Sequence, residues 1–138
     1  MKKRFLCLIT LVAMLFTCLV SCKKASIENY KSKFEDHQFT TFKNKDEIND
    51  LAKEVHLEAK DYKVKEVLYA HSGNSGVPIG VVIIQCGSKA KAKKLEKDAD
   101  SILDFMEDMY NTNMYPMTIA RDGKFVLVGT EKTINSIT

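Results

Sequence analysis

The apolar positions of the chain follow a helical period in two long segments. Between residues 44 and 60 they are Ile48, Leu51, Ala52, Val55 and Ala59. This spacing places them on one face of a helix, and Asp46 and Glu47 suit the dipole of its first turn. Between residues 87 and 110 the apolar face comprises Ala92, Leu95, Ala99, Ile102, Leu103, Met106 and Met109. With Ser88 as a favourable N-cap, this second pattern predicts the longest helix of the chain.

Strand-forming residues fill the segments around these helices. Residues 37–42 are rich in β-formers, residues 62–72 place their side chains on two alternating sides, and residues 79–86 are nearly all β-branched. Within residues 117–130, Asp122-Gly123 is a strong hairpin signal, with both residues expected at positive φ. Thr130 is placed to cap a final short helix over residues 131–137.

This order, (β)αββαββα, predicts an α+β fold. We expect a two-layer sandwich in which an antiparallel sheet of about four or five strands packs against helices. The runs "VVII" (81–84) and "FVLV" (125–128) offer apolar side chains to both faces of that sheet. Either the N-terminal segment covers the second face or a partner does, and a second copy is the simplest partner.

The first 22 residues have the pattern of an export leader. Lys2, Lys3 and Arg4 precede an apolar run from Phe5 to Val20. At 16 residues the run is shorter than a membrane-spanning helix requires. A basic start, a short apolar core and a small residue, Ser21, before the break are typical of a secretory signal peptide.

The tetrad Leu19-Val20-Ser21-Cys22 also resembles the lipobox of bacterial lipoproteins. The resemblance implies cleavage between Ser21 and Cys22 and acyl chains on the Cys22 thiol, where two chains suffice for stable anchoring. It implies a lipid-anchored protein of the bacterial cell envelope, on the outer surface of the cytoplasmic membrane or on an outer membrane. An ordinary cleaved signal that ends in a chance cysteine is the alternative.

Composition changes once the leader is removed. The remaining 117 residues have the size of one domain. The full chain has 21 Lys+Arg and 18 Asp+Glu, and three of the basic residues but none of the acidic ones lie in the leader. The mature part therefore carries 18 of each, which gives no electrostatic reason to bind nucleic acid. Cys86, at the end of a predicted strand, is expected to be buried and inert rather than a reactive or intermolecular thiol.

We expect three segments along the chain: a signal peptide (1–21), a lipidated N-terminus with a polar tether (22–33), and a single α+β domain (34–138). The tether would be a flexible coil. A short helix that begins near Ser26 and uses Ile27 and Tyr30 is the alternative for the same residues.

A glycine-rich loop is the first candidate binding site, with the residues Ser72, Gly73, Asn74, Ser75 and Gly76. His71 precedes it, but a serine hydrolase needs a converging base and carboxylate, and the sequence has no G-x-S-x-G elbow. We interpret this segment as an exposed hairpin loop that could contact a ligand. An inhibitor of an extracellular enzyme would present the same loop to its target.

Four methionines form two M-x-x-M pairs, Met106, Met109, Met114 and Met117. Thioethers suit Cu(I), so a copper-binding protein is an alternative hypothesis. Core packing is favoured, because the first pair continues the apolar face of the longest helix and methionine fills irregular gaps.

Lys89, Lys91 and Lys93 begin the longest helix, where they oppose its dipole. Either they form a solvated face, or they contact an anionic surface such as lipid headgroups.

The sequence contains no metal-ligand spacing, cofactor loop or catalytic set that we recognise. His37, His56 and His71 lie too far apart to suggest a ligand motif. The best hypothesis is a membrane-anchored, extracytoplasmic binding or scaffolding module without a cofactor, and not an enzyme. Its partners would be the membrane, through Cys22, and a second copy or another envelope protein, with no nucleic acid.

Overall fold

A computed structural model describes residues 25–33, 37–72, 80–110 and 116–138. Five strands form one antiparallel sheet in the order β1-β2-β3-β5-β4. The strands are β1 (His37–Phe42), β2 (Glu66–Ser72), β3 (Gly80–Gln85), β4 (Met117–Asp122) and β5 (Phe125–Thr130). The helices are α2 (Ile27–Lys31), α3 (Lys45–Glu54), α4 (Ala59–Tyr62), α5 (Lys89–Asp98), α6 (Asp100–Tyr110) and α7 (Glu131–Ile137). The α+β class and the antiparallel sheet are confirmed.

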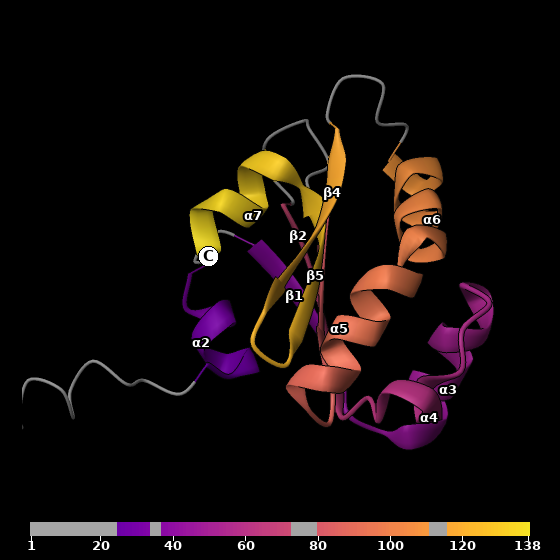
Figure 1. The fold of residues 1–138 in the computed structure, drawn as a ribbon. Helices are drawn as coiled ribbons and strands as arrows, with labels where there is room; N and C mark the ends of the chain where they lie inside the picture. The colour runs from indigo at the N-terminus through magenta and orange to yellow at the C-terminus, as the bar shows by residue number, and fades with distance from the viewer. Residues whose placement is uncertain (1–24, 34–36, 73–79, 111–115) are drawn as a thin grey trace, which may run out of the picture.

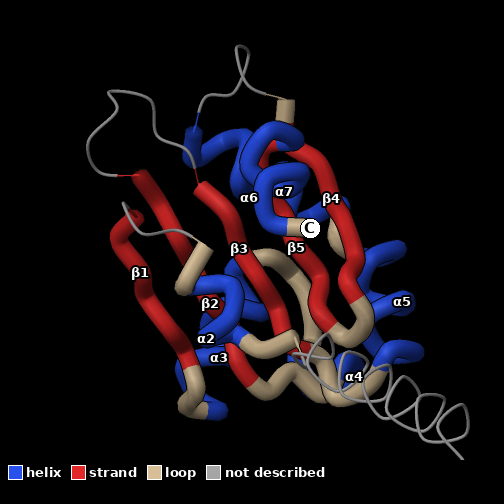
Figure 2. The backbone as a smooth tube through the Cα atoms, turned by 90° about the vertical axis from the view of Figure 1, so that its left-hand side faces the viewer, coloured by secondary structure: helices blue, strands red, loops and turns tan. Residues whose placement is uncertain are grey.

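Helices cover both faces of the sheet. Helices α3 to α6 lie on one face, and α2 and α7 lie on the other (Figure 1). In the view of Figure 2, α2 and α7 lie in front of the strands. The sheet therefore separates two apolar cores, with Ile84, Val126 and Val128 facing the first and Ile83, Leu127 and Phe125 facing the second.

The N-terminal segment, rather than a partner, provides the cover over the second face. Ser26 accepts a hydrogen bond from the Asn29 backbone N–H and so caps α2, and Ile27 and Tyr30 are buried in the second core. Residues 25–33, which are the described part of the expected tether, are therefore structured. The alternative prediction, a short helix that begins near Ser26, is the one observed. With α2 and α7 in place, no second copy is needed to bury this face.

Both long amphipathic segments are divided. The helix expected over residues 44–60 ends at Glu54, and α4 begins at Ala59. His56 lies between them in the left-handed region, with φ of 57°. The second segment breaks at Ala99 into α5 and α6, although Ser88 caps α5 as expected by accepting from the Lys91 backbone N–H. The helical period of the apolar residues does not predict where these breaks occur, because the apolar face continues across each of them.

The β4–β5 hairpin forms one residue later than the sequence predicts. Asp122 pairs with Phe125, so Gly123 and Lys124 are the central residues of the turn. Only Gly123 has positive φ, at 59°. Glycine at the first central position is the pattern of a type II′ turn, in which the second residue keeps negative φ. Asp122 thus remains in the strand and is free to bond with α2.

Candidate functional site

A pocket of about 240 Å³ lies between helices α3 and α6, over the sheet. The sheet provides its floor through Val67, Tyr69, Val82 and Ile84. One wall comes from Ile48, Leu51 and Ala52 of α3 and from its C-cap Val55, and another comes from Ile102, Phe105, Met106 and Met109 of α6. Most of the side chains that line the pocket are apolar, so apolar groups are what it can accommodate.

The pocket exists because neither helix buries its whole apolar face. Ile48 is the buried residue of α3, whereas Leu51 and Val55 stay half-buried. On α6, Phe105 and Met109 are 37% and 50% exposed. Large apolar side chains at the surface are ordinary when scattered, but here they border one opening.

The C-terminal end of α6 is held against the sheet by a close contact. A Cβ placed on Gly80 would lie 2.5 Å from the Tyr110 ring, so only glycine allows this ring to rest on β3. The Tyr110 hydroxyl is buried without a hydrogen-bond partner among the described residues. This contact fixes the wall of the pocket while leaving Met109 at its edge.

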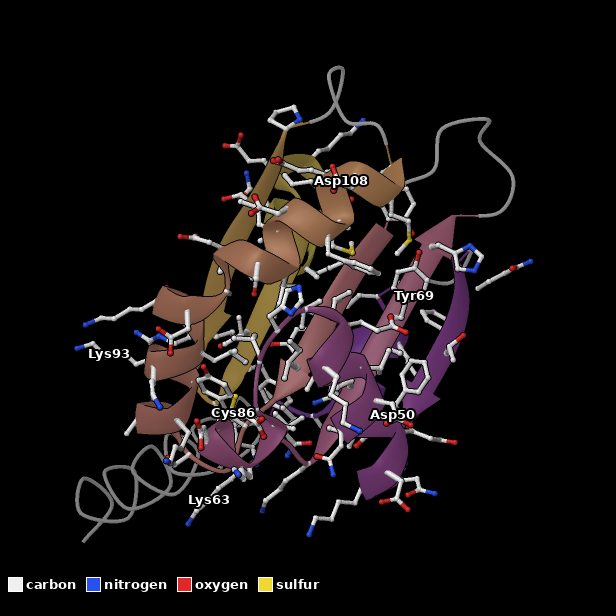
Figure 3. The ribbon with its side chains drawn as sticks, turned by 90° about the vertical axis from the view of Figure 1, so that its right-hand side faces the viewer. Asp50, Lys63, Tyr69, Cys86, Lys93 and Asp108 are labelled. Carbon is white, nitrogen blue, oxygen red and sulfur yellow. The ribbon has the colours of Figure 1, made fainter. Side chains whose placement is uncertain are left out.

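The lining contains few polar groups, namely the hydroxyls of two tyrosines and one carboxylate. Tyr69 donates a long hydrogen bond to Met109 Sδ at 3.7 Å, and burial raises the pKa of its phenol. Tyr62 donates to Asp98 Oδ2 at 3.0 Å. Glu54 is the charged residue of the lining. Figure 3 shows Tyr69 in the space between α6 and α3.

Several predicted site residues lie outside the described residues. These are Ser21 and Cys22 of the leader junction, and Gly73, Asn74, Ser75 and Gly76 of the candidate loop. Ser72 ends β2 and pairs with His37 across the sheet. Within the described ranges, no helix is both long and apolar enough to span a bilayer.

The lysines predicted to contact an anionic surface have different roles. Lys89 and Lys93 are exposed near the start of α5. Lys91 instead donates to the Asp61 backbone carbonyl at 2.7 Å and so links α5 to α4. Lys94 lies over the Tyr62 ring, 5.1 Å from its centroid. Two of the lysines on α5 are therefore engaged within the protein.

The methionines do not form one described cluster. Met106 and Met117 are buried in the first core, Met109 borders the pocket, and Met114 lies outside the described residues. In the part of the chain that the structure describes, no group of His, Cys, Asp or Glu could hold a metal ion. His71 contacts the Tyr69 ring instead, at 5.5 Å between centroids. Cys86 is fully buried, which raises the pKa of its thiol to about 11 and keeps it in the unreactive protonated form.

Of the residues that line this pocket, the sequence predicts only Met106 and Met109 as site residues, in the copper alternative. It predicts Leu51 as part of an amphipathic helix and does not single out Phe105 or Tyr69. The available signal was the excess of apolar residues on two helices, α3 and α6, that cover the same face of the sheet.

The chain matches no protein-family model, no curated protein and no solved structure. The geometry of the pocket is therefore the basis for a functional proposal.

Proposed function

We propose that the protein is an extracytoplasmic binding module, anchored to the cell envelope through Cys22, that holds an apolar group of its ligand between α3 and α6. The supporting observation is an open apolar pocket bordered by two exposed large side chains, Phe105 and Met109. Such a concave apolar site with a few polar groups is the usual form of a ligand site.

The size of the pocket supports this proposal. Its volume of about 240 Å³ exceeds that of an apolar cavity of about 150 Å³, which is large enough to admit benzene. Filling it would remove the faces of Leu51, Val55 and Phe105 from water. Each Å² of apolar surface covered contributes roughly 25 cal/mol to binding before the costs of association.

The anchor would place this pocket away from the membrane attachment. Between Cys22 and Ala25 the chain spans at most about 10 Å, because each residue extends by no more than about 3.5 Å. Ala25 packs with the second core, on the face of the sheet opposite the pocket. The proposed anchor would therefore hold the α2 side of the domain near the membrane. An unmodified Cys22 in the mass spectrum of native protein would contradict the anchor.

The pocket is tested by blocking it. Ala52 lines the pocket on α3, so Ala52→Phe should fill it and reduce binding of the neutral apolar dye Nile red at least fivefold. Ala90→Phe is the matched control, since Ala90 is exposed on α5 and does not line the pocket. Dye fluorescence is measured on the soluble chain that starts at Lys23, with circular dichroism to show that each variant folds. Equal binding by both variants, or no binding by the unsubstituted chain, would refute the proposal.

A further inference from the structure

We infer that the ligand held in this pocket is a peptide segment of a partner protein in which an apolar side chain is flanked by lysine or arginine. The inference rests on the proposed function and specifies the chemistry of the ligand. It follows from the charges around the opening and from the size of the pocket.

Exposed carboxylates adjoin the apolar wall on α3. Glu54 itself lines the pocket, and it lies three residues after Leu51, on the neighbouring position of the helix surface. Glu47 lies four residues before Leu51, on the same side. Both carboxylates are exposed, and neither has an ion-pair partner among the described residues. A positively charged group next to an apolar side chain bound in the pocket would lie close to these two carboxylates.

On α6 the exposed carboxylates lie beside the pocket wall and not in its lining. Asp108 lies three residues after Phe105, and Asp104 lies one turn before Asp108, farther from the residues of α6 that line the pocket. The helix contains four acidic residues and no basic one. Neither Asp104 nor Asp108 forms an ion pair within the described part of the chain.

The basic residues of this region lie outside the apolar lining. Lys45, Lys53 and Lys60 line a second depression between α3 and α4, which shares Leu57 and Ala59 with the apolar pocket. Lys53 also pairs with Asp50 at 3.1 Å. Among the described residues no lysine, arginine or histidine lines the apolar pocket, and His71 contacts Tyr69 of its floor from outside the lining. Because the mature chain as a whole is neutral, this acidic border is a local feature that repels anionic ligands and favours cationic ones.

The size of the pocket suits a single large apolar side chain. Its volume of about 240 Å³ exceeds the roughly 150 Å³ of an apolar cavity that admits a benzene ring. Phe105 and Met109 extend the apolar surface beyond the pocket itself. An anchor residue in a pocket, with apolar contact around it and charges at the rim, is the arrangement of a protein interface.

Three peptides test the charge preference. They share the core Leu-Phe-Leu and carry two lysines, two glutamines or two glutamates on each side. Calorimetric titration of the soluble chain should show the lysine peptide binding about tenfold more tightly than the glutamate peptide, with the glutamine peptide between them. The difference should shrink as salt screens the rim charges.

Two double variants show where the preference originates. Glu54→Gln with Asp108→Asn should reduce the preference for the lysine peptide at least threefold, while leaving the glutamine peptide unchanged. Glu28→Gln with Glu131→Gln removes the same charge from the opposite face of the sheet and should have no effect. Ala52→Phe should weaken all three peptides.

Each result decides a separate point. Equal affinity for the three peptides would overturn the charge inference while the pocket stands. Nile red binding without binding of any peptide would overturn the peptide as ligand and leave the proposed function intact. Failure of both dye and peptides to bind would refute the proposed function as well. A preference that the pocket variants do not change would place the peptide site elsewhere and overturn the inference.

Discussion

Two tyrosine hydroxyls connect elements that are distant in the sequence. Tyr30 of α2 donates to Asp122 Oδ2 at 2.6 Å, which ties α2 to the end of β4. Tyr62 of α4 donates to Asp98 of α5 at 3.0 Å. Burial, and then the neighbouring carboxylate, raise the pKa of both phenols. Each hydroxyl must therefore stay protonated for its bond to persist.

Tyr62 contributes to the pH dependence of stability, together with the other buried groups whose pKa is raised. Its pKa rises from 10.0 to about 12, so its contribution is complete below pH 10 and is lost as the pH rises toward 12. Urea unfolding at several pH values in this range should show the free energy of unfolding falling, and falling less steeply in Tyr62→Phe. Asp98→Asn, which keeps the buried phenol but removes the carboxylate, should lie between the two. Identical slopes for all three proteins would contradict this assignment.

At the scale of elements, the end of α3 determines the shape of the pocket wall. The Leu57 N–H donates to the Ala52 carbonyl at 2.8 Å and the His56 N–H donates to the Lys53 carbonyl at 3.1 Å, which is a Schellman motif. Glycine is the usual residue at the left-handed position of this motif, but here the position holds His56. The existence of the helix could be predicted from its apolar period, whereas this end could not, because no glycine marks it.

Replacing His56 with glycine should stabilise the protein. A residue with a Cβ in the left-handed region costs about 1–2 kcal/mol, and the greater freedom of glycine in the unfolded chain offsets about half of that gain. We therefore expect the free energy of unfolding to rise by roughly 0.5–1 kcal/mol in a denaturant titration. His56→Ala, which retains a Cβ, is the control and should show no such rise. A loss of stability in His56→Gly would mean that the His56 side chain makes a contribution of its own.

At the scale of the whole molecule, the second core depends on the residues that precede β1. Ile27 is 2% exposed and packs with the core around Leu68 and Phe125. Tyr30 meets the Phe125 ring edge-on at 5.3 Å between centroids. The folded unit thus includes residues 25–33, and the boundary expected at residue 34 lies inside it.

Truncation tests this boundary. A chain that starts at residue 34 should expose the second face of the sheet and lose several kcal/mol of stability relative to one that starts at Lys23. We expect a lower unfolding midpoint and a larger apparent size in gel filtration. Ile27→Ala in the longer chain should act in the same direction by roughly 2–4 kcal/mol. Equal midpoints for the two chains would show that α2 contributes nothing to the fold.

The sequence by itself determined the α+β class, the order of the elements and the burial of Cys86, because these depend on local periodicity and propensity. The sequence did not decide whether the N-terminal segment or a partner covers the second face of the sheet. Tertiary structure decided that α2 forms this cover together with α7, and it divided both long helices. It also brought α3 and α6 together around a pocket over Tyr69. These features depend on how the apolar faces of distant segments pack against one sheet. A local pattern of apolar residues does not specify how closely two such faces pack against each other.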